Sequence, residues 1–366
     1  MKKFIYTTLF FVFLNHGLFA SNGNINYELI FKAENLISSG QYSLAVDIYE
    51  KIFKVQKNIS YVELNNACLC YIELKQFHEA IALCDSLVLK GYRLEDFDKE
   101  WFAVLKETEL WNSFANGRYH TLRETYIKTV DWEYREKLYH AIRNDQIVSR
   151  TYKAKTSDST YYAQMVTLFE LFNQHGFPGC FMQKDSLSIK LMAAFRHYFG
   201  LYHRFDETDN RLYKFSKYNL EETLINAIKK GLLSPHILQS TYSWSEMGNK
   251  YGEITAEVSI KEQSLVLSGL NPLQISSINK QRGNVFLPPI TKGYLDTLAY
   301  NTQKNMPFIE IYDAIKKCTT CKNNSDFSDL IFEIKDSNQK SSTSGFLLNT
   351  IPAITGWFLP EDFTKF

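Results

Sequence analysis

A short polar group near the middle of the chain has the residue types that chemistry needs. Asp145 and Gln146 are adjacent, and Arg150 follows four residues after the glutamine. Residues four apart share one face of a helix, so the Gln146 amide and the Arg150 guanidinium would present planar donors on the same side. Such a pair can hold a carboxylate or another anion. A salt bridge between helices gives the same pattern more often, since structural ion pairs imitate functional sites.

Two histidines extend this hypothesis. His175 precedes the rigid turn Gly-Phe-Pro-Gly at 176–179, and His197 lies among aromatic residues. Either imidazole could act as an acid, a base or a metal ligand, although a histidine on an apolar helix face is more often a core residue. The candidate catalytic residues of a hydrolase-type pocket are therefore Asp145, Gln146, Arg150, His175 and His197. The chain has no His-Glu-x-x-His motif or comparable metal spacing, so we expect no metal and no cofactor.

The cysteines include one close pair. Cys318 and Cys321 form a Cys-x-x-Cys motif flanked by lysines, whose charge favours the thiolate. No strand-helix-strand context suggests a thioredoxin fold, and one pair is too few for zinc. A local disulfide of structural type is the expectation in an exported protein. Cys68 and Cys70, two apart on a helix, are expected in the core.

The elements that would carry these residues begin with a repeat. Segments 40–49 and 75–84 match at a spacing of 35 residues. The matching positions are Tyr42, Ala45 and Tyr49 in the first segment, and Phe77, Ala80 and Cys84 in the second. This pattern resembles the tetratricopeptide repeat, in which paired helices stack and leave a concave groove. Phe97, Phe102 and Trp111 predict a degenerate third unit or cap.

Helix-end signals continue to about residue 248. Ser60 with Glu63 and Asn219 with Glu222 have the spacing of capping boxes, and Asp131 and Asp185 are placed to begin further helices. Gly91, Gly176 and Gly231 are placed to end helices, and Ser234-Pro235 to start one. After residue 252, alternating residues predict a short hairpin. The expected fold is mainly α: tetratricopeptide-like hairpins, then a helical domain with a small β element and an irregular C-terminal segment.

The N-terminus has the layout of a secretory signal peptide. Lys2 and Lys3 precede an apolar run from Phe4 to Leu14, and Ala20 offers a cleavage site. We therefore expect a periplasmic or secreted protein with no membrane span after cleavage, although Leu18 leaves uncleaved anchoring as an alternative. The predicted divisions are 1–20 signal peptide, 24–115 repeats, 116–285 helical domain and 286–366 mixed segment.

The stretch from about 132 to 285 resembles a bacterial family of unknown function that is often found behind tetratricopeptide-like repeats in exported proteins. The resemblance is carried by Asp145-Gln146, the 176–179 turn, His197, Gly231–Ser234, Gly248, Tyr251-Gly252 and Asn279–Arg282. The sequence departs from the family where Ser149 stands in place of its arginine and near Trp244-Ser245. The resemblance implies an architecture and no activity.

Two functions remain open at this point. The chain has 41 basic and 40 acidic side chains, a net charge of +1 that argues against nucleic acid as a partner. The first hypothesis is a scaffold that binds a peptide or protein in the groove of the repeat. The second is a hydrolase that uses the five candidate residues, and we lean towards a protein that is not an enzyme.

Overall fold

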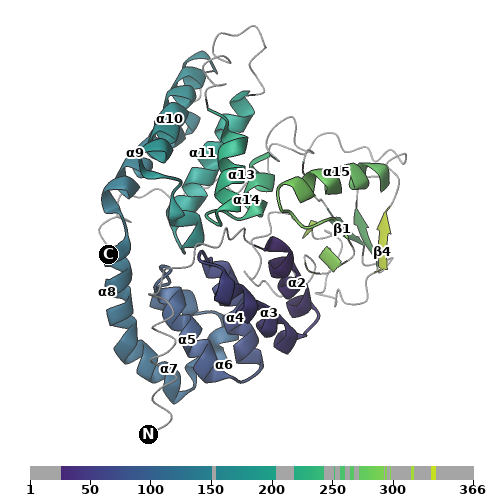
Figure 1. Ribbon diagram of the computed structural model, residues 1–366. Coiled ribbons are helices and arrows are strands. Elements are labelled where there is room, and N and C mark those ends of the chain that lie inside the picture. The colour runs from purple at the N-terminus through teal and green to yellow at the C-terminus, as the bar shows by residue number, and fades with distance from the viewer. Residues whose placement is uncertain are drawn as a thin grey trace.

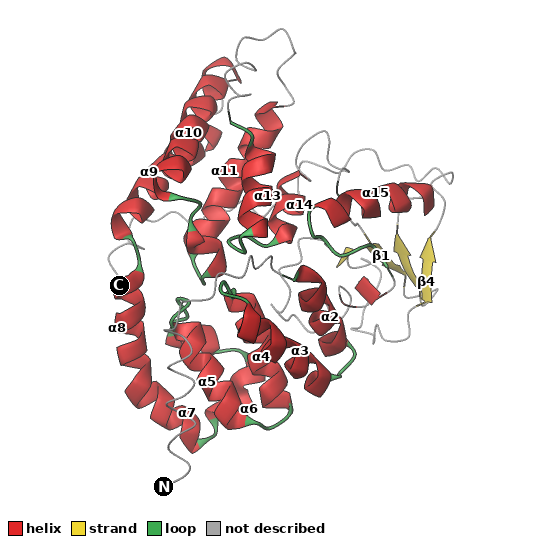
Figure 2. Cartoon of the chain, viewed as in Figure 1, coloured by secondary structure: helices red, strands yellow, loops and turns green. Residues whose placement is uncertain are grey.

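Helices make up most of the structure (Figure 2). The computed structural model describes residues 26–150, 154–202, 218–242, 251, 256–259, 264–267, 272–291, 293, 294, 297, 315–316 and 331–334. The mainly α fold expected from the sequence is confirmed. Among the described helices, none is both long enough and apolar enough to cross a bilayer. The leader, Gly248, Cys318 and Cys321 lie outside the described residues.

The first part of the chain forms two helical hairpins. They are α2 (Tyr27–Ser38) with α3 (Tyr42–Val55) and α4 (Tyr61–Glu73) with α5 (Phe77–Val88), and α3 packs on α4 (Figure 1). Residues with small side chains at the crossings are fully buried: Ala33, Ala45, Ala67, Cys68, Ala80 and Cys84. Because these side chains are short, the backbones of neighbouring helices approach closely.

The helix ends of this region follow the sequence signals. Ser60 and Glu63 form the expected capping box at the start of α4. Gly91 has φ +96° just after α5, a conformation that favours glycine. Local capping residues therefore mark where α4 begins and where the chain leaves α5.

Short elements then cap the stack. They are η1 (Leu94–Phe97), η2 (Glu100–Phe102), α6 (Ala103–Lys106), α7 (Glu109–Ser113), the π-helical turn η3 (Phe114–Arg118) and α8 (Tyr119–Thr129). Phe97 is fully buried, and its ring centroid lies 5.2 Å from that of Phe102, 5.4 Å from Trp111 and 5.8 Å from Phe114. An aromatic cluster thus closes the apolar side of the repeat.

The central domain is built from longer helices. They are α9 (Trp132–Arg150), α10 (Ala154–His175), the short η4 (Gly179–Met182), α11 (Ser186–Tyr202), α13 (Leu220–Lys229) and α14 (Pro235–Tyr242). Asp131, Asp185 and Asn219 cap α9, α11 and α13 through their side-chain oxygens. Arg135 also forms a bidentate ion pair with the buried Asp185, which fixes α9 against the start of α11.

A small sheet with one helix lies beyond α14. Strands β1 (Ala256–Ser259) and β2 (Ser264–Leu267) pair antiparallel, with Ala256 opposite Leu267. The short β3 (Ile315–Lys316) runs parallel to β1, and β4 (Ile331–Ile334) runs parallel to β2, in the order β3-β1-β2-β4. Helix α15 (Pro272–Asn284) lies beside this sheet, on the α2 and α14 side of the molecule (Figure 1).

Candidate functional site

Two of the five sequence-predicted residues come together in the central domain. Asp145 on α9 and His197 on α11 lie 2.8 Å apart, measured from Oδ2 to Nδ1. The Asp145 side chain is 1% exposed and the His197 side chain 29% exposed. The Tyr161 ring on α10 packs 5.1 Å from the imidazole. This contact holds the imidazole in a fixed orientation at the partly exposed side of the helix bundle.

His175 lies apart from this pair. It is exposed at the end of α10, where its ring stacks on Tyr134 at 4.6 Å, and the Tyr134 hydroxyl donates to the Gly176 carbonyl over 2.7 Å. Tyr134 precedes Asp145 by eleven residues, which is about 16 Å along a helix. The structure therefore does not bring His175 into one pocket with Asp145 and His197. The Gln146 and Arg150 side chains lie outside what the structure describes.

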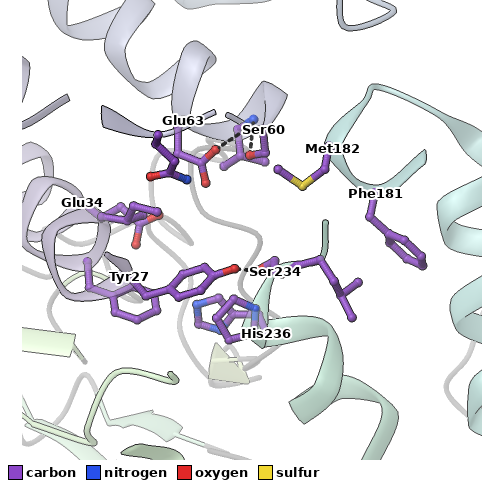
Figure 3. Close-up of a pocket in the computed structure, with 14 residues that line it drawn as sticks. Tyr27, Glu34, Ser60, Glu63, Phe181, Met182, Ser234 and His236 are labelled. Atoms are coloured by element: carbon purple, nitrogen blue, oxygen red, sulfur yellow. Dashed lines mark hydrogen bonds between the residues drawn. The ribbon is translucent and has the colours of Figure 1, made fainter. Parts of the chain in front are cut away.

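A second group of polar residues surrounds a pocket between the repeat and the central domain (Figure 3). Its walls come from α2 and α4 on one side and from η4 and the start of α14 on the other. The space inside is about 30 Å³, room for one or two water-sized groups. We call this region the seam pocket. Its labelled residues in Figure 3 are Tyr27, Glu34, Ser60, Glu63, Phe181, Met182, Ser234 and His236.

Two carboxylates face the pocket from the repeat. Glu34 on α2 is 7% exposed. Glu63 on α4 is partly exposed, and its carboxylate accepts a 2.6 Å hydrogen bond from the Ser60 backbone N–H. The protein surroundings raise the pKa of Glu63 by desolvation, against the lowering effects of its hydrogen bonds and of Lys90. The repeat side of the pocket is therefore rich in hydrogen-bond acceptors.

His236 forms the opposite wall. It is 3% exposed, and neither of its ring nitrogens has a hydrogen-bond partner in the structure. Gln239, one turn along α14, interacts with the His236 ring and favours its protonated form. Burial lowers the pKa of His236 to about 3, with a further contribution from Arg282. The imidazole is therefore neutral at ordinary pH.

Aromatic and cationic groups support His236 from behind. Its ring packs edge-on to Phe31 at 5.6 Å and parallel to Tyr294 at 6.5 Å. The fully buried Arg282 lies over the Tyr294 ring, with its guanidinium carbon 5.0 Å from the ring centroid. Its guanidinium donates to the carbonyls of Pro288 and Tyr251 at 2.6 and 2.9 Å. Tyr251 and Arg282, from two segments singled out in the sequence, thus meet behind the His236 wall of the seam pocket.

Hydrogen bonds join the two sides around the pocket. The Tyr27 hydroxyl donates to the carbonyls of Ile228 and Leu233 at 2.8 and 3.1 Å. At the edge, the Asn58 amide donates to the Lys230 carbonyl over 2.8 Å. Tyr27 and Asn58 belong to the repeat, whereas all three acceptors belong to the turn and helix end between α13 and α14. The pocket is therefore a shared feature of two segments about 200 residues apart.

The described cysteines add no site of their own. Cys68, Cys70, Cys84 and Cys180 are buried thiols, and the sulfurs of Cys68 and Cys84 lie 3.8 Å apart. Burial raises the pKa of Cys70, Cys84 and Cys180. Buried thiols with raised pKa values are poor nucleophiles, so these residues serve packing. The described part of the chain also contains no group of three metal-ligand side chains.

Comparison with known proteins gives no further guide to function. No family model, curated protein or solved structure matches the chain.

Sequence reasoning identified Asp145 and His197 but missed Glu34 and His236 as site residues, and it treated Glu63 only as a capping residue. The available signals were weak. Glu34 follows the closely packed Ala33, and His236 follows the helix-starting Ser234-Pro235 pair. Neither position is unusual for a charged or polar residue in the first or middle turns of a helix. Their positions along the same pocket depend on tertiary packing that no local pattern encodes.

Proposed function

We propose that the protein is a scaffold that binds a peptide or protein partner through its helical repeat, with a small group of the partner entering the space between the repeat and the central domain. The observation that supports this is the seam pocket, where the buried His236 lacks hydrogen-bond partners. Leaving a buried polar group unsatisfied costs about 1–3 kcal/mol, a cost that a ligand can remove. The proposal is consistent with the expected tetratricopeptide-like repeat, because stacked repeats create extended concave binding surfaces.

We also propose that the protein acts outside the cytoplasm, after removal of a signal peptide near Ala20. The support is the charged, apolar and small-residue pattern of the first twenty residues. Expression in a bacterial host, fractionation and N-terminal sequencing of the exported chain test this. A mature chain that starts at Ser21 in the periplasmic fraction is expected, and a full-length chain in the cytoplasm would contradict it.

Selection from a displayed peptide library on the full mature chain tests the binding function. Peptides enriched on the wild-type protein should lose at least tenfold in affinity for the His236→Phe variant, whose added ring atoms replace the polar wall. Exchange of the exposed His140 for phenylalanine is the matched control and should leave affinity unchanged. Absence of enriched peptides, or equal binding to both variants, would reject the proposal.

The Asp145–His197 contact favours a second candidate, a hydrolase. A buried carboxylate that binds Nδ1 of a histidine orients the ring and leaves Nε2 to act as a base. A panel of chromogenic esters, amides and phosphate esters tests this with wild-type protein and His197→Asn, with His140→Asn as control. An enzyme of this kind should lose at least 100-fold in kcat/KM in the His197 variant alone. No turnover by the wild type would remove this candidate for the substrate classes in the panel.

A further inference from the structure

The crossing of α4 and α5 brings two cysteines into contact. The sulfurs of Cys68 and Cys84 lie 3.8 Å apart, and both side chains are fully buried as thiols. The two helices form the second hairpin of the repeat and pack side by side (Figure 1). Two thiols that touch within one hairpin are the groups from which a disulfide is made.

The first hairpin fills the corresponding positions differently. Ala33 and Tyr49 stand 35 residues before Cys68 and Cys84, and both are buried. The Tyr49 ring supplies bulk, and its hydroxyl accepts a hydrogen bond from the Asn66 amide over 3.1 Å. The second hairpin has two small sulfur-containing side chains at these positions in place of a ring. A covalent link would therefore hold α4 to α5 where the side chains bury less apolar volume.

The direction of each side chain favours this pair over the other described cysteines. Successive residues of a helix are rotated by about 100°, so Cys70 projects from α4 at about 200° from Cys68. Cys180 lies on η4 in the central domain. The Cys68 thiol donates to the Ala80 carbonyl on α5 over 3.4 Å, so it is turned toward that helix. Among the described cysteines, Cys68 and Cys84 therefore have the arrangement that a bond needs.

A small approach of the two side chains completes the bond. The sulfurs of a disulfide are about 2.05 Å apart, so those of Cys68 and Cys84 must move about 1.8 Å closer than their present 3.8 Å. The bond replaces the weak hydrogen bond from the Cys68 thiol to the Ala80 carbonyl. Little else that the structure shows around the two sulfurs has to be given up.

From these contacts we infer that Cys68 and Cys84 form a disulfide that fixes α4 to α5 when the chain folds in an oxidising compartment. The inference goes beyond the proposed binding function and rests on the proposed location outside the cytoplasm, where disulfides persist. A chain that folds after export presents both thiols to solvent before α4 packs on α5.

The oxidant is a dithiol oxidoreductase in its disulfide form, the class that keeps the bacterial periplasm oxidising. The thiolate of one cysteine attacks a sulfur of the oxidant's disulfide and forms a mixed disulfide. The thiolate of the second cysteine then attacks the first cysteine's sulfur and releases the oxidant. The two thiols lose two protons and two electrons, and the oxidant gains them and leaves as a dithiol. Burial raises the pKa of Cys84, so the reaction belongs to the folding chain, and the finished bond is shielded from reductants.

Peptide mapping of the exported chain tests the bond. The chain with its leader is expressed in a bacterial host, and the periplasmic fraction is denatured in N-ethylmaleimide to block free thiols. Trypsin cleaves after Lys75, which separates Cys68 and Cys70 from Cys84. Digestion without reduction should give the two peptides joined, two hydrogens lighter than their sum. Fragmentation should place an N-ethylmaleimide group on Cys70.

Two variants on the same helix make the matched comparison, because Cys68 and Cys70 are both fully buried on α4. Cys68→Ala should leave Cys84 blocked by N-ethylmaleimide and the peptides separate, whereas Cys70→Ala should keep them joined. The wild-type chain expressed without its leader should carry free thiols, since the cytoplasm keeps thiols reduced.

Thermal unfolding measures what the bond contributes. The mature wild type is compared in its oxidised form and after denaturation, reduction and refolding in reductant. A disulfide restricts the unfolded chain, so reduction should lower the Tm by about 5 °C. Cys68→Ala retains Cys318 and Cys321, so any contribution from these two appears in both proteins and cancels. An equal change of Tm in the wild type and in Cys68→Ala would overturn the inference.

The outcomes separate this inference from the proposed location. Blocked thiols at both Cys68 and Cys84 in a chain that reached the periplasm, or a bond from Cys84 to Cys70, would overturn the inference while the location stands. A full-length chain retained in the cytoplasm would contradict the location instead. Refolding of the denatured mature chain in a mixture of reduced and oxidised glutathione then decides the inference: joined peptides support it, and separate blocked peptides overturn it.

Discussion

The contacts between α9 and α11 and the start of α14 at the seam pocket differ in how their buried polar side chains are paired. In the central domain, Arg135 pairs with Asp185 in a bidentate contact, and His197 pairs with Asp145 at 2.8 Å. In the seam pocket, His236 is only 3% exposed and more enclosed than His197, yet both of its ring nitrogens lack partners. Satisfied buried groups stabilise a fold, whereas an unsatisfied one reduces stability and is retained only where it serves another purpose. The proposed binding function rests on this difference.

The largest expected effect comes from breaking the best-satisfied pair. Arg135→Met leaves the Asp185 carboxylate, 1% exposed, without its cation. Removing one partner of a buried ion pair typically costs about 3 kcal/mol in the free energy of unfolding. Urea unfolding followed by circular dichroism measures the change. Lys137→Met, which breaks the exposed ion pair between Lys137 and Glu133 near the start of α9, is the control. A loss for Arg135→Met no larger than that of the control would show that the central domain is not held as described.

The second effect is a dependence of stability on pH that comes from His236. Its pKa is about 3 in the folded protein, compared with about 6.5 in an unfolded chain. The unfolded state therefore binds more protons between these values, so stability falls as the pH is lowered. Between pH 7 and pH 5 this amounts to about 2 kcal/mol. We expect the free energy of unfolding, measured with urea at both pH values, to fall by about 2 kcal/mol more in the wild type than in His236→Phe.

Glu63 affects the pH dependence of stability in the opposite direction, so both the wild type and His236→Phe must retain it. Its raised pKa means that the folded state holds a proton more tightly than the unfolded state, so its contribution falls as the pH rises. Because wild type and His236→Phe share Glu63, the difference between their pH profiles isolates the histidine. Parallel profiles would contradict the assignment of His236 as a buried neutral group.

A third test exchanges each histidine for phenylalanine at pH 7. His197→Phe removes the partner of Asp145 and should lower the free energy of unfolding by about 1 kcal/mol. His236→Phe removes two unsatisfied nitrogens and replaces them with an apolar ring between Phe31 and Tyr294, so it should raise stability by about 1 kcal/mol. Thermal unfolding at matched concentration gives both values. The same sign for both variants would remove the contrast between the two regions.

The smallest effect is expected at the edge of the seam pocket. Asn58 donates to the Lys230 carbonyl at an exposed position, where water can replace it. Asn58→Ala should therefore change stability by about 0.5 kcal/mol or less. Chemical unfolding with replicate measurements resolves a change of this size. A loss above about 1.5 kcal/mol would show that the contact holds the two segments together more strongly than its exposure suggests.

Local signals in the sequence predicted much of the fold. The side chains of Ser60 and Asp131 cap helices where their types and positions indicate, and Gly91 and Gly231 have the positive φ that ends a helix. The 35-residue spacing places Tyr42 and Phe77 at the first positions of α3 and α5. These features depend on interactions within a few residues or on one repeated face. Such interactions can be read from a single chain.

The site was predicted only in part, for a physical reason. Asp145 stands out in the sequence as part of a polar Asp-Gln pair, and His197 as a histidine among aromatic residues; the structure joins the two. Glu34 and His236 have ordinary local surroundings, and 202 positions separate them in the chain. Their placement along one pocket depends on how the repeat packs on the central domain, which neither capping nor periodicity specifies. Prediction of the seam pocket therefore required the tertiary structure.

The span of the Tyr27 contacts has a consequence for biosynthesis. Its hydroxyl finds acceptors at Ile228 and Leu233, 201 and 206 residues later. A ribosome adds about 5–20 residues per second, so α2 waits roughly 10–40 seconds before those carbonyls exist. During that interval the nascent repeat can pair its hairpins, but the face that will border the cavity has no covering. A chaperone that recognises incompletely folded chains would find its most persistent target on that face.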